Sequence, residues 1–501
     1  MRQALHIFRK DVRFLWPPIL VVLAMTAIFA WSRSVDPSRF IRGNTGVGAT
    51  NLLDTVSSFL VLAWWYLIAC LIYKEQPAGD RQFWVTRPYS WKSLLAAKTL
   101  LIVTFINASF LISDIAILSA NGLSPSKAAA NLLGRQLAIT AIFLLPAAAL
   151  AATTRHLAYI AFALSVVLLL NLFFNPGGSE GLYHLWGRLA WIPEWTTAAI
   201  LAAGSFAVLA WQYASRRTPI SWTILAGVSA ICAAILMAKP VGPAIALQSH
   251  FPSASADVPE VRLSFAPGAH PKGGIMIGPS KFVQFPPGMH GWVPIRINGF
   301  SPGVQVKADL VKVTIHGPQG TSWSSGWIHS SPSTQSRGPI EWAQAWIGDE
   351  NRFLYVTIGK QPLESFQSQP VSVSVSVAMT VFRTETATQL MSGEPDRSIA
   401  GVGNCSVRGM NAPGSPWLLC RSAESSPVRV DVQGIPLIEA SYAPKWGIFA
   451  QSPVSRLYES LADRRSLFNE GPIYITTGRP VAHVRRDLEI PQIRLWEAPS
   501  R

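Results

Sequence analysis

The sequence has little charge and contains no motif that would supply chemistry or energy of its own. Only 14% of the 501 residues are charged, against about 25% in soluble domains, and the mean hydropathy is +0.28. A G-x-x-x-x-G-K-[ST] phosphate loop, a G-x-S-x-G nucleophile motif and H-x-x-x-H metal-ligand spacing are all missing. We therefore expect no catalytic residues, no metal and no cofactor.

Runs of Lys and Arg with interleaved aromatic residues are also missing, although the net charge is +15. Nucleic-acid binding usually requires such a basic patch. Arginines that flank membrane helices on the cytoplasmic side and face anionic lipid explain the excess of positive charge. We expect the lipid bilayer as a partner and no nucleic acid.

Cysteine is scarce, with four residues. Cys70 and Cys232 lie in apolar stretches, where a thiol behaves as a small buried hydrophobe. The spacing of Cys405 and Cys420 fits neither a redox motif nor a zinc site, but it fits a disulfide in an oxidising compartment. Such a bridge stabilises a domain by about 3 kcal/mol on the chain-entropy model.

The sequence is rich in apolar stretches of bilayer length, all within residues 1–238, and many begin or end at Trp or Tyr. They predict an all-α membrane bundle of six or seven transmembrane helices, because three of the stretches, the first, fifth and seventh, are short. The predicted spans are Phe14–Trp31, Thr55–Tyr73, Leu95–Leu118, Leu132–Ala152, Leu157–Phe174, Trp195–Tyr213 and Ser221–Ala238.

The distribution of basic residues predicts the orientation. The N-terminal stretch and the loop after the second span are rich in Lys and Arg, and most of the alternate loops are poorer. The exception is the first outer loop, which holds Arg33, Arg39 and Arg42. The balance places the N-terminus inside, and seven spans then place the C-terminal half outside. The proposed disulfide agrees with that placement.

The residues ahead of the first span form one apolar helical face, made by Leu5, Phe8, Val12 and Leu15. This pattern predicts an amphipathic helix on the inner leaflet. A simple cytoplasmic extension of the first span explains it equally well.

The third predicted span contains a carboxylate, Asp114. An intramembrane carboxylate can mark a substrate or proton path. Asp114 is close to the predicted outer end, so we expect it to cap the helix or to be hydrated there. It is also the only titratable candidate deep in a span for a membrane-embedded enzyme.

The loop between the second and third spans has a distinctive local pattern. Asp80 predicts the N-cap of a short helix from Arg81 to Thr86. Pro88 ends that helix, and Ser90 can cap the helix that becomes the third span. Phe83 and Trp84 would then offer aromatic contacts beside Arg81 and Arg87 to a protein that docks on the inner surface.

This loop resembles that of the permease subunits of type-2 ATP-binding-cassette (ABC) exporters. The acidic residue, glycine, proline and lysine of that family fall at Glu75, Gly79, Pro88 and Lys98. The segment Asp80–Trp84 replaces the usual Gly-Thr-Leu-Glu-like core. The basic N-terminal segment Phe8–Arg13 is similar as well. The resemblance covers about residues 1–240, and we interpret the seventh span, one more than the family usually has, as an added anchor for the outer domain.

The resemblance implies a permease of the bacterial cytoplasmic membrane that forms a homodimer or heterodimer and is powered by a separate ABC ATPase subunit. Movement of the ATPase would reach the spans through residues 74–98. The implied ATPase-coupling residues are Glu75, Gly79, Asp80, Arg81, Phe83, Trp84, Arg87, Pro88 and Lys98.

The C-terminal half has a different pattern. Residues 239–259 are rich in Pro, Ala and Ser and predict a linker. Residues 260–501 contain short alternating runs between Gly and Pro turns, which predict an extracytoplasmic all-β, sandwich-like domain, either one large sandwich or two smaller ones. Ser455 to Asn469 is predicted to form a helix.

Two other functions are consistent with the same features. The protein could be a non-transporting membrane anchor that presents the β-domain for sensing, adhesion or envelope assembly. A weaker alternative is a membrane-embedded enzyme that uses Asp114. The sequence does not identify a transported substrate.

Overall fold

The structure is a computed structural model. It describes residues 2–34, 46–73, 90–154, 189, 191–215, 217–238, 240–250, 260–267, 275–277, 281–283, 291–299, 301–329, 340–343, 346–347, 353–358, 360–366, 369–384, 388–390, 395–399, 403–409, 416–423, 428–432, 435–440, 453–460 and 473–495.

The N-terminal half is helical. Its elements are α1 (Arg2–Phe14), α2 (Trp16–Ser34), α3 (Gly46–Tyr73), α4 (Trp91–Ile102), the π-helix η3 (Val103–Ala108), α5 (Ser109–Ala120), α6 (Ala129–Ile139), the π-helix η4 (Thr140–Leu144), α7 (Leu145–Thr153), α10 (Trp191–Ser215), α11 (Thr218–Ala238) and α12 (Val241–Gln248).

Six helices in the described part of the chain are long and apolar enough to cross a membrane. They are Trp16–Ser34, Val56–Tyr73, Trp91–Ala120, Ala129–Thr153, Trp191–Ser215 and Thr218–Ile235. Each overlaps a predicted span, so six of the seven predictions are confirmed as helices of membrane-spanning type. The predicted fifth span, Leu157–Phe174, lies outside the described residues.

The N-terminal amphipathic segment forms a helix of its own. A bend at Leu15 separates α1 from α2, and Pro17 and Pro18 occupy the first turn of α2, where a missing N–H costs no helical hydrogen bond. Ile7 of α1 is 4% exposed and packs into the helical core. The structure therefore supports a separate amphipathic helix rather than an extension of the first span.

One apolar core joins the helices, with buried residues from α1 to α7 and from α10. Small residues allow close packing, as in membrane bundles generally. At Gly204 of α10, an added Cβ would lie 2.3 Å from Val228 Cγ2 of α11. A larger residue at position 204 would push these two helices apart.

The C-terminal half consists of antiparallel sheets. The strands are β1 (Arg262–Phe265), β2 (Ile275–Ile277), β3 (Lys281–Val283), β4 (Gly291–Asn298), β5 (Val304–His316), β6 (Ser322–His329), β7 (Ile340–Ala343), β8 (Trp346–Ile347), β9 (Phe353–Ile358), β10 (Val371–Thr384), β11 (Thr388–Leu390), β12 (Arg397–Ile399), β13 (Gly403–Gly409), β14 (Pro416–Ser422), β15 (Val428–Val432), β16 (Ile435–Ala440), β17 (Ser455–Ser460) and β18 (Ile473–Ile493). Two short helices, η6 (Pro318–Gly320) and α13 (Lys360–Phe366), connect strands.

Two of these sheets share one core. The four-stranded sheet has the order β1-β4-β9-β7, and the main path of the eight-stranded sheet is β16-β15-β18-β10-β5-β6. Alternate residues of β4 and β9 are buried with alternate residues of β5 and β10 in a single cluster, for example Ile295, Val356, Val313 and Val375. This is the period-two pattern of strands with one face turned to a core. A separate four-stranded sheet has the order β12-β13-β14-β17.

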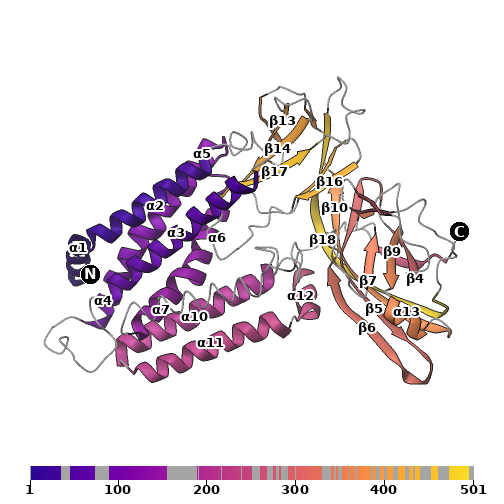
Figure 1. Ribbon diagram of the computed structural model, residues 1–501, viewed down its shortest axis with the longest axis horizontal. Coiled ribbons are helices and arrows are strands. Elements are labelled where there is room, and N and C mark those ends of the chain that lie inside the picture. The colour runs from indigo at the N-terminus through magenta and orange to yellow at the C-terminus, as the bar shows by residue number, and fades with distance from the viewer. Residues whose placement is uncertain are drawn as a thin grey trace.

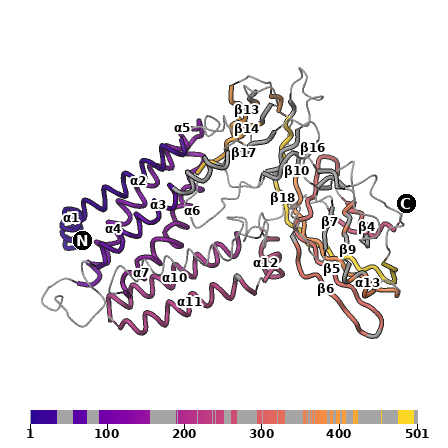
Figure 2. The backbone as a smooth tube through the Cα atoms, viewed as in Figure 1, coloured from indigo at the N-terminus to yellow at the C-terminus, as the bar shows by residue number. Residues whose placement is uncertain are grey.

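The strands lie at one end of the helices and α1 lies at the other (Figure 1). Figure 2 shows α12 between α11 and the strands β5 and β6. Val241, Ala244 and Ile245 of α12 are buried with Leu310 of β5 and Ala378 of β10. The eight-stranded sheet thus docks on the helix that directly follows the last described membrane helix.

The structure differs from the sequence-based expectation in three segments. Within the predicted linker 239–259, residues 241–248 form α12, because their apolar side chains are buried against the sheet. Residues 455–460 of the predicted helix form β17, which pairs with β14. Only short strands were expected within residues 260–501, but Ile473–Ile493 form one long strand, β18, whose pairing with β10 is irregular opposite Phe382, near Pro480. Such irregularities tolerate proline within a sheet.

Candidate functional site

Most residues of the predicted coupling loop lie outside the described part of the chain. They are Glu75, Gly79, Asp80, Arg81, Phe83, Trp84, Arg87 and Pro88. The description resumes at Ser90, whose side chain accepts a hydrogen bond from Ser93 N and caps α4 as predicted. Lys98, the last residue of the loop motif, lies within α4 and is described.

Lys98 forms a buried ion pair with the N-terminal helix. Its Nζ lies 2.8 Å from Asp11 Oδ2, and both side chains are 3% exposed. Phe8, one turn earlier on α1, stacks on Phe105 with 6.3 Å between the ring centroids. Breaking such a pair by removing one partner costs about 3–5 kcal/mol, because it leaves a buried charge without compensation. The pair therefore fixes α1 to the helix that leaves the predicted coupling loop.

Asp114 forms a second buried ion pair, between α5 and α6. Arg135 Nε lies 2.9 Å from Asp114 Oδ2, and the aspartate side chain is fully buried. The expectation that Asp114 caps its helix or is hydrated is wrong. Arg135 occupies the facing helix at the same level and supplies the counter-charge, and the protein encloses both groups.

A cluster of three aromatic rings lies beside the Asp114–Arg135 pair and contacts it through Phe110. The Arg135 guanidinium carbon lies 5.0 Å from the ring centroid of Phe110. The Phe110 ring in turn contacts the rings of Phe29 and Trp64, at centroid distances of 5.5 Å and 5.1 Å. The cation is thus held over an aromatic face, an arrangement that is favourable when the pair is removed from water.

The predicted disulfide is confirmed. Cys405 of β13 and Cys420 of β14 face each other in the antiparallel register and are bonded. Both are fully buried. This bridge fixes the hairpin that contacts the helices: Asn404 Nδ2 donates to Gly122 O after α5, and Asn131 Nδ2 of α6 donates to Ala423 O after β14.

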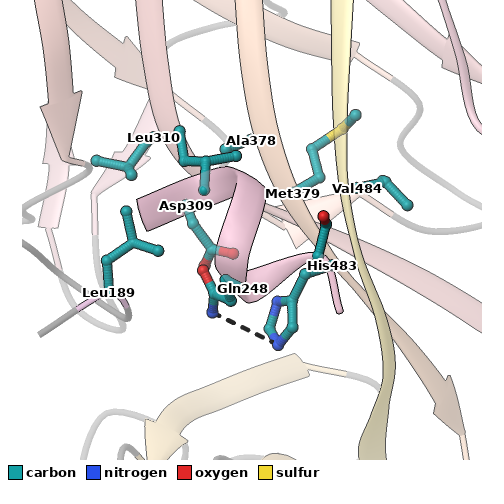
Figure 3. Close-up of a pocket in the computed structure, with 10 residues that line it drawn as sticks. Leu189, Gln248, Asp309, Leu310, Ala378, Met379, His483 and Val484 are labelled. Carbon is teal, nitrogen blue, oxygen red and sulfur yellow. Dashed lines mark hydrogen bonds between the residues drawn. The ribbon is translucent and has the colours of Figure 1, made fainter. Parts of the chain in front are cut away.

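A pocket lies where α12 meets the eight-stranded sheet (Figure 3). Its cavity volume is about 10 Å³, roughly the space that one water molecule needs. Its apolar lining comes from Leu189, Ile245, Leu310, Ala378, Met379 and Val484, and its polar lining from Gln248, Ser249, Asp309 and His483.

A β-bulge directs the acidic residue of this pocket. Ala378 of β10 faces Leu310, and Met379 faces Ala308, so Asp309 is the extra residue on β5. Thr380 donates its hydroxyl hydrogen to Asp309 Oδ2. His483 Nδ1 lies 2.8 Å from the same threonine oxygen and therefore donates to it.

The hydrogen-bond chain continues to α12. With its proton on Nδ1, His483 presents a bare Nε2 to the Gln248 amide nitrogen 3.5 Å away, as Figure 3 shows. At the other end of the chain, Lys307 Nζ lies 3.9 Å from Asp309 Oδ1. Thr380 is fully buried, and its hydroxyl donates a hydrogen bond to the Asp309 carboxylate. It is therefore not available as a nucleophile for a solute. This chain of hydrogen bonds links β5, β10 and β18 to α12.

Sequence reasoning missed this chain because its members are far apart along the sequence. One signal was present: the alternation of Val304–Ile315 breaks at Leu310-Val311, directly after the bulge residue Asp309. Arg135, the partner of Asp114, lies near the start of a different predicted span, Leu132–Ala152. Among the described residues, no group of three or more His, Cys, Asp or Glu side chains could hold a metal ion.

Comparison with known proteins gives no family for this chain. No protein-family model matches the sequence, and no curated protein matches it either.

Proposed function

We propose that the protein is the membrane-spanning permease component of an ABC exporter, powered by a separate ATPase that docks on residues 74–98. The observation that carries this proposal is the buried Asp11–Lys98 ion pair. It joins α1 to α4 close to the point where α4 leaves that loop. A protein that moves the loop would therefore move α1 and the third predicted span together.

The arrangement of the two halves supports an outward-facing β-domain. The structure places α1 and the strands at opposite ends of the helices (Figure 1). Tyr73, the last residue of α3, is hydrogen-bonded at 2.6 Å to Thr154, the residue after α7. Leu189, in contrast, lies in the cluster with α12 and the sheet. In a chain with seven spans and a cytoplasmic N-terminus, the ends of the second and fourth spans, at Tyr73 and Thr154, have to lie on the cytoplasmic side. The start of the sixth span, next to Leu189, has to lie on the outer side. We propose a bacterial cytoplasmic membrane location and a sandwich-like outer domain on this basis.

The test is co-purification of the full chain with an ABC ATPase encoded beside it, followed by ATPase assays in nanodiscs. The double variant Phe83→Ala/Trp84→Ala is expected to lose the ATPase partner, because it removes both aromatic contacts of the loop. Phe206→Ala, on α10 with 61% of its residue surface exposed, is the matched control and should keep the partner.

Retention of the ATPase by the double variant would contradict the role of the loop. If no ATPase gene is adjacent and none co-purifies, the protein is instead a non-transporting anchor for the β-domain. That outcome would leave the membrane fold unchanged and would remove the exporter proposal.

A further inference from the structure

The inner faces of α5 and α6 carry four polar residues below the turn that joins these helices. Ser113, Asp114, Arg135 and Gln136 are 5%, 0%, 8% and 9% exposed. Asp114 is six residues from the end of α5 at Ala120, which places it about 9 Å below that end at 1.5 Å per residue. The cluster therefore lies within the span rather than at its rim.

Two of these residues can satisfy each other. Asp114 Oδ1 and Arg135 Nη2 have no hydrogen-bond partner among the described residues, but they flank the existing Nε–Oδ2 contact. A small rotation would complete a two-pronged arginine–carboxylate pair. This pair is neutral as a whole and does not by itself require a ligand.

The other two residues have no such solution. Both polar atoms of the Gln136 amide and the hydroxyl of Ser113 are buried without a hydrogen-bond partner in the described structure. Burying an amide or hydroxyl unpaired costs about 1–3 kcal/mol per group in proteins, and hydrocarbon surroundings offer no water to satisfy it. A leucine at position 136 would avoid this cost, so the buried amide indicates a partner that the described residues do not supply.

Both helices change from α-helical to π-helical geometry next to the polar cluster. The π-helical segment η3 lies just before α5, and η4 lies just after α6. Asn107 Nδ2 of η3 donates to Thr140 Oγ1 of η4 at 3.1 Å. Single π-turns within α-helices occur frequently at functional sites. Here two of them face each other directly below the polar cluster.

The surroundings combine polar groups with an apolar aromatic wall. Phe29, Trp64 and Phe110 pack together beside Arg135. A ligand that fits both parts has a hydrogen-bonding group joined to an apolar body. Because Asp114 and Arg135 neutralise each other, the site selects a polar group without net charge.

We propose that Ser113, Asp114, Arg135 and Gln136 form an occluded intramembrane site for the uncharged polar head of an amphiphile, one that carries hydroxyl or amide groups. The proposal deepens the proposed transport function by naming the substrate class, and it rests on that function only for the statement that the ligand is transported. The disulfide-linked hairpin contacts the turn after α5 through Asn404 and contacts α6 through Asn131.

The experiment uses the full chain in phosphatidylcholine nanodiscs without any ATPase. The probe is an alkyl glucoside with a diazirine on the first carbons of its alkyl chain, and peptides are mapped by mass spectrometry. We expect labelling within residues 103–144, competed by dodecyl maltoside. Gln136→Leu should reduce specific labelling about tenfold, the effect of losing two hydrogen bonds of about 0.7 kcal/mol each.

The matched control is Leu137→Ala, because Leu137 is adjacent on α6 and 66% exposed, and its labelling should not change. Equal labelling of Gln136→Leu and the unaltered chain would overturn the proposal. Equal competition by dodecyl sulfate or dodecyltrimethylammonium would overturn the uncharged class. Labelling confined to lipid-facing residues would also overturn the proposal.

The labelling experiment and the co-purification test can succeed or fail independently of each other. Gln136→Leu removes a buried unpaired amide, so it should fold at least as stably as the unaltered chain, and a thermal melt checks this. Specific labelling, combined with failure of any ATPase to co-purify with the chain, would support the site and contradict the exporter. Co-purification of an ATPase without specific labelling would support the exporter and contradict the site.

Discussion

Asp11 and Lys98 are 87 residues apart in the sequence, and their side chains meet at 2.8 Å in the interior of the helical half. The contact joins the amphipathic helix α1 to α4, the first part of the third predicted span. Two charges enclosed in this way stabilise the fold only as a pair. The N-terminal helix is therefore an integral part of the helical bundle.

Removing one partner of this pair should be costly. Lys98→Met removes the ammonium group that lies beside the buried Asp11 carboxylate, and the free energy of unfolding should fall by about 3–5 kcal/mol. Titration of the micelle-bound protein with dodecyl sulfate measures this change.

The double variant Asp11→Leu/Lys98→Met is the control for charge. With both charges replaced by apolar groups of similar size, most of the stability should return. A double variant as unstable as Lys98→Met would mean that the two charges do not act as a pair.

Gly204 is required for the contact between α10 and α11. In Gly204→Ala the new methyl group would lie 2.3 Å from Val228 Cγ2, and valine has a single preferred rotamer in a helix. Overpacking of this kind costs about 1–3 kcal/mol. Gly227→Ala is the matched control, since no atom lies within 4 Å of its added Cβ. It should raise the melting temperature slightly, because alanine favours helix. A stable Gly204→Ala protein would exclude this packing.

The Thr380 hydroxyl should matter more than its methyl group. Thr380→Val keeps the shape and removes the hydrogen bond to Asp309, so the free energy of unfolding should fall by about 1–3 kcal/mol. Thr380→Ser keeps the hydroxyl and should lose less. Chemical unfolding of the full chain in detergent compares the two, and the opposite order would refute the assigned hydrogen-bond chain.

The disulfide should be detectable by thiol counting. The chain has four cysteines, and Cys70 and Cys232 are free. Alkylation of the unfolded chain should therefore add two groups without reductant and four after reduction. Cys405→Ser/Cys420→Ser should lower the free energy of unfolding by about 3 kcal/mol on the chain-entropy model. Four alkyl groups without reductant would rule out the bridge.

The proposed orientation can be tested on intact cells. A membrane-impermeant maleimide should label Ser301→Cys in the β-region and should not label His6→Cys in α1, both made in a Cys70→Ala/Cys232→Ala background. Permeabilised cells should show labelling at both positions. Reversed labelling would place the β-region in the cytoplasm and contradict the positive-inside assignment.

Most helices were predictable because their signal is local. A stretch of about 20 apolar residues suffices to indicate a span, and six of the predicted spans coincide with long apolar helices. The N-cap at Ser90 was predicted from local chemistry too. The disulfide between Cys405 and Cys420 was predicted from their spacing along the chain.

Predictions failed where distant contacts override local pattern. Residues 241–248 contain glycine and proline, yet they form a helix because the eight-stranded sheet buries one of its faces. Ser455–Ser460 pairs as a strand because β14 offers an open edge. Asp114 looked like a residue at a wet helix end because its partner, Arg135, belongs to another predicted span.

The sequence alone determined that the first half of the chain has membrane-spanning helices and the second half has strands, because hydrophobic length and period depend on neighbouring residues. Only the tertiary structure decided the pairs Asp11–Lys98 and Asp114–Arg135 and the chain from Lys307 to Gln248. The reason is physical: a buried charge is tolerated only where a partner meets it. Which residue becomes that partner depends on how helices and strands far apart in the chain pack together.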